Sequence, residues 1–399
     1  MKKLKPLVWL GVIVLFVSMF AVGACSSTPK PNANGVITAD QWKNVYPDVY
    51  NSYQLNKGNS EYGSYLTDYP FLVTIYDGMG FAKDYNHARA HVYTLQDLDA
   101  TARPHALANC LTCKTPEFTA LVNRDGASVY ALDYAEVAAK ISEPVSCYNC
   151  HENTGDQLVV TAQFLKNALG SDISKVDEKF LACAQCHNEY YFDPTTKATT
   201  LPWTGLNNMN PDAYLKYYND IKFSDYTNSV SGAGMIKVQH PEFETILGAG
   251  NKLSFMQPMG IEGCSSCHMG TTTNASGKEY TSHFWRSPLE NSELMSSKCN
   301  TCHSDIKKSV EAIQKNTISR LNTIGKKYET LHKEIGKAAA AGTKSEADLA
   351  KLRSLVRDGQ FYYDFCFVEN SNGAHNSAMT KSLLDKAEKY VDEALAMLK

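Results

Sequence analysis

Ten of the twelve cysteines fall into five pairs with two residues between the members. In four of these pairs a histidine follows the second cysteine directly, which is the signature of covalent haem attachment. The two thiols add to the porphyrin vinyl groups, and the adjacent histidine is placed to bind the iron. Zinc sites also use cysteine pairs, but they do not require a histidine at that position. The four motifs are Cys147, Cys150 and His151; Cys183, Cys186 and His187; Cys264, Cys267 and His268; and Cys299, Cys302 and His303.

The first pair, Cys110 and Cys113, is followed by Lys114 in place of histidine. An amine binds iron only when it is deprotonated, which costs free energy at neutral pH. The use of a lysine despite this cost indicates that this haem has a different function from the other four. If the sixth position of this iron is open, it is the position where substrate binds. The alternative is a degenerate motif that has lost its haem.

The N-terminal segment has the features of an export signal. Three lysines among the first five residues precede an apolar stretch from Leu7 to Ala21, and the sequence VGAC follows. This pattern predicts a lipoprotein-type signal peptide over residues 1–24, with Cys25 as the lipidated residue and a polar tether over residues 25–40. The protein would then be exported and lipid-anchored, in the periplasm or on the outer face of the cell membrane. A transmembrane anchor is the alternative, but the stretch is shorter than the roughly 20 residues of a spanning helix.

Residues 41–399 are predicted to form a single domain, because five porphyrins would supply much of one shared core. Removal of residues 1–24 changes the formal net charge from −3 to −6. The sequence therefore gives no indication of a nucleic-acid surface. The remaining cysteine, Cys366, lies in an aromatic run from Phe361 to Phe367, and we interpret it as a buried apolar residue and not as a reactive thiol.

One C-x-x-C-K motif followed by four C-x-x-C-H motifs resembles the pentahaem ammonia-forming cytochrome c nitrite reductases. Three segments outside the motifs also resemble blocks of that family, namely residues 85–91, 188–192 and 237–244. The resemblance implies five covalent haem c groups and six-electron reduction of nitrite to ammonium at the lysine-ligated haem. The other four haems would relay electrons. The alternatives are a non-catalytic electron-transfer cytochrome and a reductase of hydroxylamine, nitric oxide or sulfite.

The same resemblance implies a catalytic pocket made of Lys114, Arg103, Tyr190 and His240. The residue types suit the reaction, because an arginine can hold an anion through hydrogen bonds to its oxygens. A histidine exchanges protons near neutral pH, and a tyrosine offers a hydroxyl proton. His105, two residues after Arg103, is the competing nearby group.

A calcium site is also implied by the resemblance. Glu189 and Gln239 would supply side-chain oxygens, while Tyr190 and Lys237 would supply backbone carbonyls. Ligation by oxygen alone suits a hard cation. The alternative for Glu189 is a salt bridge without a metal.

Distal haem ligands are expected among the histidines outside the motifs. By resemblance, His91 serves the third haem in sequence, His283 the second and His375 the fourth. His87 and His332 receive no role, and are expected to be exposed or part of the core.

The fifth haem has no histidine in the interval from residue 241 to residue 263, where the family has one. Met256 and Met259 lie there instead. Methionine is an axial ligand in other c-type cytochromes, so we predict methionine ligation, with Met256 preferred to Met259. The alternatives are methionines that pack on porphyrin, ligation by His332, or a five-coordinate iron.

The expected fold class is all-α, with a loop-rich multihaem core wrapped around the haems and a helical C-terminal third over residues 304–399. Apolar residues recur at spacings of three and four from Ile306 to Ile335, and Ser345 with Asp348 forms a capping-box pattern after a break at Gly342. A last helix is predicted from Met379 to Leu398. The resemblance implies a homodimer formed through these helices. The electron donor would be a quinol dehydrogenase or a soluble cytochrome.

Overall fold

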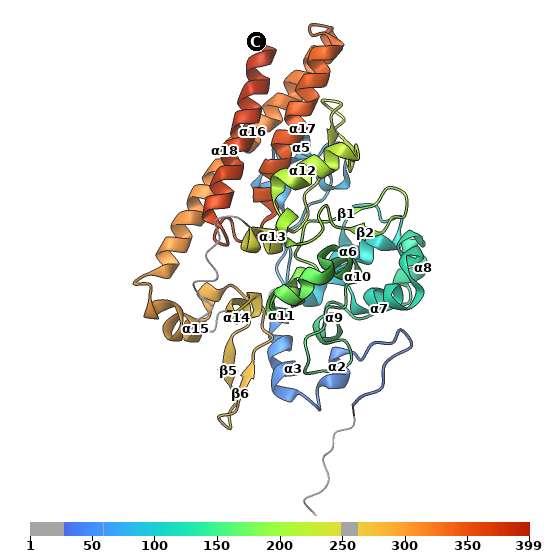
Figure 1. Ribbon diagram of the computed structural model, residues 1–399, viewed down its shortest axis with the longest axis vertical. Helices are drawn as coiled ribbons and strands as arrows, with labels where there is room; N and C mark the ends of the chain where they lie inside the picture. The colour runs from blue at the N-terminus through green and yellow to red at the C-terminus, as the bar shows by residue number, and fades with distance from the viewer. Residues whose placement is uncertain (1–27, 59, 249–261) are drawn as a thin grey trace, which may run out of the picture.

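The computed structural model describes residues 28–58, 60–248 and 262–399, and within these ranges the chain is mainly helical (Figure 1). The helices are α2 (Ala39–Trp42), α3 (Pro47–Gln54), α4 (Tyr65–Asp68), α5 (Leu72–Ile75), α6 (Thr94–Ala100), α7 (Pro116–Asp125), α8 (Tyr134–Ala138), α9 (Cys147–His151), α10 (Gln163–Leu169), α11 (Glu178–Ala184), α12 (Pro211–Asp220), α13 (Glu242–Leu247), α14 (Cys264–His268), α15 (Ser292–Ser297), α16 (Ile306–Ala341), α17 (Glu346–Val368) and α18 (Ser377–Leu398). The strands are β1 (Tyr191–Phe192), β2 (Thr199–Thr200), β3 (Tyr226–Thr227), β4 (Gly234–Met235), β5 (Thr271–Thr273) and β6 (Glu279–Thr281). The strands form only antiparallel pairs, β1 with β2, β3 with β4 and β5 with β6, so the all-α prediction is confirmed.

Short helices separated by loops build the part of the molecule that carries the cysteine motifs (Figure 1). Two motifs are themselves single helical turns, since α9 and α14 each begin at the first cysteine and end at the histidine. Residues three and four apart share one face of a helix. The turn therefore presents both sulfurs and the imidazole to the same side, as haem attachment requires.

Three long helices, α16, α17 and α18, lie side by side at the C-terminal end (Figure 1). The predicted break is confirmed, because Gly342 ends α16 with a left-handed φ of 63°. The predicted cap of α17 is confirmed too, because the Asp348 backbone N–H donates to Ser345 Oγ at 3.1 Å.

Aromatic side chains fill the interface between these helices and the rest of the protein. Tyr328 of α16 is fully buried, and its hydroxyl donates to the Ala387 carbonyl of α18 at 2.8 Å. A Cβ on Gly359 of α17 would lie 2.2 Å from that hydroxyl oxygen. Glycine is therefore required where α17 passes Tyr328. Cys366 is buried here, as predicted.

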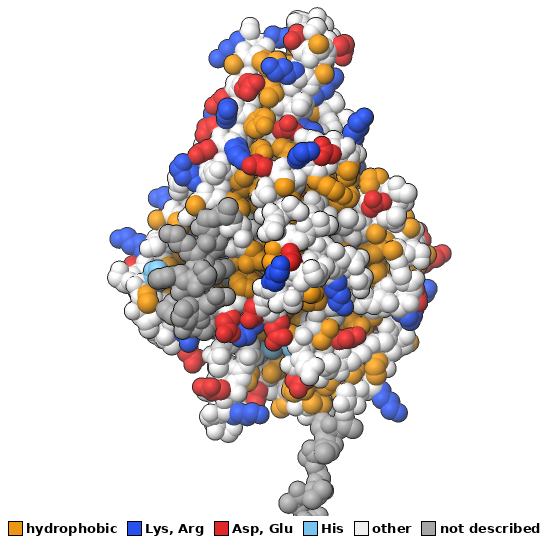
Figure 2. All heavy atoms as spheres, in the orientation of Figure 1, with side chains coloured by type: hydrophobic (Ala, Val, Ile, Leu, Met, Phe, Trp, Pro, Cys, Tyr) orange, Lys and Arg blue, Asp and Glu red, His pale blue; other side chains and the backbone are white. Residues whose placement is uncertain are grey.

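The outer surface of the helical end carries charges of both signs side by side (Figure 2). Lys327 of α16 pairs with Glu388 and Asp392 of α18, each at 2.9 Å, and Arg320 pairs with Asp385 at 2.8 Å. None of the helices formed by the described residues is long and apolar enough to cross a membrane.

The structure corrects the boundary of the predicted tether, residues 25–40. The chain packs against the domain from Asn32 onward, because the side-chain amides of Asn32 and Asn34 donate to Glu117 Oε1 at 2.8 and 2.9 Å. Val36 and Ile37 are buried. The predicted signal peptide and Cys25 lie outside the described residues.

Candidate active site

A cavity of about 860 Å³ lies where the first four cysteine motifs meet. Its wall includes one or both cysteines of each of these motifs, together with Lys114 and the three motif histidines. The wall therefore supplies thiols and imidazoles, the groups that attach and ligate covalent haem, among buried apolar side chains. Cys299, Cys302 and His303 of the fifth motif are not among the residues that line it.

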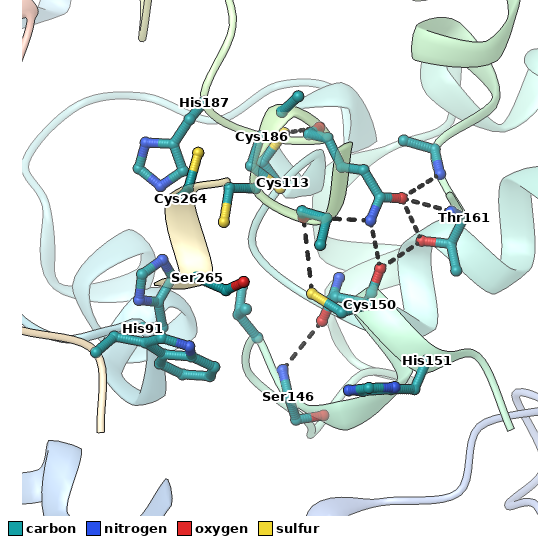
Figure 3. A pocket seen from close by; sticks show the side chains of 18 of the residues that line it. His91, Cys113, Ser146, Cys150, His151, Thr161, Cys186, His187, Cys264 and Ser265 are labelled. Atoms are coloured by element: carbon teal, nitrogen blue, oxygen red, sulfur yellow. Dashed lines mark hydrogen bonds between the residues drawn. The ribbon is translucent and has the colours of Figure 1, made fainter. Parts of the chain in front are cut away.

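Three motif histidines each face a histidine that the resemblance assigns to the same haem, and His187 also faces His240, with ring centroids 5.8 Å apart. The ring centroids are 6.1 Å apart for His151 and His283, 5.9 Å for His187 and His91, and 6.0 Å for His268 and His375. Metal–imidazole bonds of roughly 2 Å place two axial rings on one iron roughly 6 Å apart. Figure 3 shows His91 and His187 beside one open space.

The third motif lies at the centre of the group. The Cys186 thiol is within hydrogen-bonding reach of Cys113 of the first motif (Figure 3). The Cys183 thiol is within reach of Cys264 of the fourth. The second motif approaches as well, since Cys150 Sγ lies 3.7 Å from the Ala182 carbonyl. Haems attached to these motifs would be close neighbours, with the third in contact range of the other three.

Lys114 lines the same cavity as Tyr190 and His240. The backbone changes direction just before it, because Cys113 has a left-handed φ of 61°. The Lys114 carbonyl is held by Thr94 Oγ1, which donates to it at 2.7 Å. The first motif thus differs from α9 and α14 in backbone shape as well as in its last residue.

Arg103 lies near this group but is not among the residues that line the cavity. Its guanidinium stacks 4.2 Å above the Phe81 ring, and its Nε donates to Thr101 Oγ1 at 3.1 Å. Burial lowers the pKa of Arg103, while the nearby Tyr190 and Cys110 oppose that shift. The competing residue His105 points elsewhere, with Nε2 3.0 Å from the Leu98 carbonyl.

Burial controls the proton-exchanging groups of the cavity. It lowers the pKa of His240 to about 4, so the imidazole is neutral at physiological pH. The His240 Nδ1 atom has no hydrogen-bond partner within the described ranges. Burial also raises the pKa of Tyr190, which keeps its hydroxyl protonated. The cavity therefore holds one free imidazole nitrogen and one phenolic proton donor.

The predicted cation ligands come from two neighbouring segments, residues 189–190 and 237–239. Glu189 is fully buried and accepts hydrogen bonds from the Tyr218 hydroxyl at 2.8 Å and from the Gln239 backbone N–H at 2.7 Å. The Gln239 side-chain amide lies 3.1 Å from the Lys237 carbonyl. The Glu189 carboxylate and the Lys237 carbonyl therefore both lie next to Gln239.

The charge around Glu189 also fits a cation. Burial raises the pKa of Glu189 and raises those of two neighbouring carboxyls, Asp225 to about 7 and Glu244 to about 8. The Lys237 ammonium pairs with Asp364 at 3.1 Å and opposes the rise in pKa only at Asp225 among these three carboxyls. A hard cation bound by oxygen ligands would stabilise the buried carboxylates.

Sequence reasoning missed two further groups. Asp364 of α17 binds both the ammonium of Lys237 and the Val238 N–H, and so ties the segment before His240 to the helical end. Trp285 lies between two distal histidines, with ring centroids 4.8 Å from His91 and 6.4 Å from His283. Neither residue stands in a motif, so only the fold brings them to the site.

The fifth motif is the least enclosed. Cys302 and His303 are exposed among the described residues. The predicted ligand Met256 and its alternative Met259 lie outside the described residues. The other alternative, His332, is wrong for this haem, because both of its ring nitrogens are hydrogen-bonded, to Ser231 Oγ at 2.8 Å and to Gln360 Oε1 at 2.7 Å.

Fold and site together define a multihaem c-type cytochrome. Residues 38–399 match the cytochrome c552 family, and the chain belongs to it. A cytochrome c-552 of Desulfotalea psychrophila is 32% identical over 395 residues, which cover 90% of this chain and 74% of the relative. The solved cytochrome c nitrite reductase of Desulfovibrio desulfuricans is similar with a TM-score of 0.79 and 26% identity, over 92% of this chain and 86% of that one. The catalytic subunit of that enzyme has two calcium sites. The predicted relationship to the nitrite reductases and the presence of haem c are therefore confirmed.

Proposed function

We propose that this protein reduces nitrite to ammonium at the haem attached through Cys110 and Cys113, with Lys114 as the proximal ligand. The observation that carries the proposal is the difference between the first motif and the next three. The three histidine pairs occupy His91, His283 and His375, so none of these is left for the iron at Lys114. Lys114 would hold this iron in the cavity that Tyr190 and His240 also line.

Conversion of nitrite to ammonium and two waters consumes six electrons and eight protons. When bound, the first haem supplies the iron that binds nitrite, and the other four supply electrons. Arg103, which lies beside the cavity and outside its lining, would turn toward the anion and hold it through a charge that persists at any physiological pH. His240, neutral and with a free Nδ1, accepts protons from solvent and passes them on, and Tyr190 donates from its hydroxyl.

Calcium is part of the same proposal. Side-chain oxygens of Glu189 and Gln239 and backbone carbonyls of Tyr190 and Lys237 would hold it. The buried, uncompensated Glu189 carboxyl supports this site, as do the calcium sites of the similar Desulfovibrio enzyme. An ion here would fix the segments that carry Tyr190 and His240.

The remaining features of the proposal concern the whole protein. We expect one domain with five haems, Met256 at the fifth iron, and lipidated Cys25 holding the exported protein at a membrane. We also expect a homodimer formed through α16 to α18 and electrons delivered by a quinol dehydrogenase or a soluble cytochrome.

The test is ammonium production from nitrite by the purified holoprotein with a reduced viologen as donor. The spectrum should show one high-spin haem that responds to nitrite. A Lys114→His variant should keep its covalent haem, measured by mass, and lose most of its turnover. His87→Ala is the matched control, because that half-buried histidine pairs with Asp68 and is not among the residues that line the cavity.

A protein whose haems are all low-spin and indifferent to nitrite, and which forms no ammonium, would be an electron-transfer cytochrome instead.

A further inference from the structure

The histidines that face each other across the cavity differ in the contacts of Nδ1, the ring nitrogen that would not bind iron. In three of them Nδ1 lies 3.0 Å from a backbone carbonyl. These contacts join His151 to Gln157, His283 to Thr281 and His268 to Arg286. In two of the remaining three, His375 and His187, Nδ1 faces a carboxylate: it lies 2.6 Å from Glu369 Oε1 in His375 and 3.3 Å from Glu242 Oε2 in His187.

Glu369 is built into the turn that follows α17. It is 3% exposed, so little water screens its charge. The Ser371 hydroxyl donates to Oε2 at 2.6 Å, and the Ser371 and Gly373 N–H groups donate at 3.3 and 3.4 Å. These donors are neutral, and the ion pair of Glu369 is with His375. The His375 imidazole is therefore the ionisable partner of this carboxyl group.

Glu242 is held by the same turn. Asn370, the next residue after Glu369, donates to Glu242 Oε1 from its backbone at 3.1 Å and from its side chain at 2.6 Å. The other oxygen, Oε2, is left to face His187. One short segment between α17 and α18 thus positions both carboxylates. Glu242 faces His187 of the third motif, and Glu369 faces His375, the partner of the fourth motif's histidine.

We propose that Glu242 and Glu369 are positioning residues that lower the reduction potentials of the third and fourth haems. The proposal rests on the histidine pairs assigned above. An imidazole that donates its N–H to a carboxylate becomes more basic toward the metal than one that donates to a carbonyl. A stronger donor favours ferric over ferrous iron. The second haem, with carbonyls on both imidazoles, lacks this effect.

The consequence concerns the driving force for electron transfer. The third motif lies next to Cys113 of the first. An electron on a haem of lowered potential leaves it with a larger driving force. Glu242 would therefore increase the driving force for electron transfer from the third haem to the first, and it would increase the driving force for transfer to the second haem equally.

The experiment is a potentiometric titration of the holoprotein without nitrite, followed by the electron paramagnetic resonance signals of the low-spin haems. Glu369→Gln removes the charge with little change in size. The midpoint potential of one haem should rise in this variant, while the others stay in place. Glu242→Gln should raise the midpoint potential of a different haem. The rise should be smaller, because the contact between Glu242 and His187 is longer than that between Glu369 and His375. Glu117→Gln is the matched control, since Glu117 is 2% exposed and accepts from amide groups only.

Glu369→Asp keeps the charge and separates its effect from a folding defect. Its haem should stay nearer the parent potential than in Glu369→Gln. Equal shifts in the two variants, no shift in Glu369→Gln, or the same shift in Glu117→Gln would overturn the proposal. Because no nitrite is present, the result does not depend on ammonium formation. A parent protein that lacks the expected histidine-ligated signals would instead refute the ligand pairs.

Discussion

The haem-binding part and the three C-terminal helices are stabilised in different ways. From α16 to α18 the buried residues are side chains that contact one another, and the helices have caps and cross-helix hydrogen bonds. In the haem-binding part, short helices surround a cavity whose walls are cysteines and histidines. The first region carries its core in its own sequence. The haem-binding part needs covalently bound groups to complete its core, so folding and cofactor attachment are coupled there.

The largest expected effect follows from making the protein without haem attachment. Amide hydrogen exchange in α9, α11 and α14 should then approach the rate of an unfolded chain, while α16 to α18 keep much of their protection. Exchange measured by mass spectrometry on the two forms tests this. Equal protection in both regions would show that the haems are not needed for the fold.

The next effect separates chemistry from stability. His240→Ala or Tyr190→Phe should lower nitrite turnover by about 100-fold to 10,000-fold, the usual range for a lost proton-transfer group. Steady-state kinetics and haem content measure it. Near-normal turnover in both variants would mean that the cavity is misassigned.

Removal of calcium should affect the haem-binding part alone. Chelation is expected to lower activity several-fold without loss of covalent haem, because the ion supports the segments that carry Tyr190 and His240. Added calcium should restore activity. Metal analysis that finds an active, calcium-free protein would contradict the site.

His332 offers a test in the helical region that depends on pH. Burial lowers the pKa of His332 to about 4, below its ordinary value near 6.5. Between these values the unfolded chain binds a proton that the folded chain does not, so stability falls as pH drops through this window and is complete above it. His332→Gln should remove up to ~3 kcal/mol of that pH dependence. Denaturant unfolding at pH 7 and pH 4.5 measures the difference.

The smallest expected effect is at the start of α17. Ser345→Ala removes the cap on the Asp348 N–H and should cost ~1 kcal/mol of stability. Thermal melting of the variant measures it, and haem spectra should not change. A change in the spectra would show that the two regions are more tightly coupled than their packing indicates.

Sequence reasoning succeeded where the information is local. The spacing of apolar residues gave α16, and the pair Ser345 and Asp348 gave the start of α17. The histidines that we assign as axial ligands came from the resemblance and stay a prediction. The carboxylates that face two of these rings were not foreseen, because Glu369 and Glu242 stand outside the haem motifs and meet their imidazoles only in the fold. The tether boundary failed for a related reason, since Asn32 looks like a linker residue until Glu117 is placed opposite it.

The contacts between thiols of different motifs set the order in which the protein can be made. Cys113 lies beside Cys186, and Cys183 lies beside Cys264. In an oxidising compartment, a chain that compacted first would join these neighbours as disulfides and consume the sulfurs that haem needs. We therefore expect haem to be attached to each motif while the motifs are still far apart, and a reductant to protect the thiols until then.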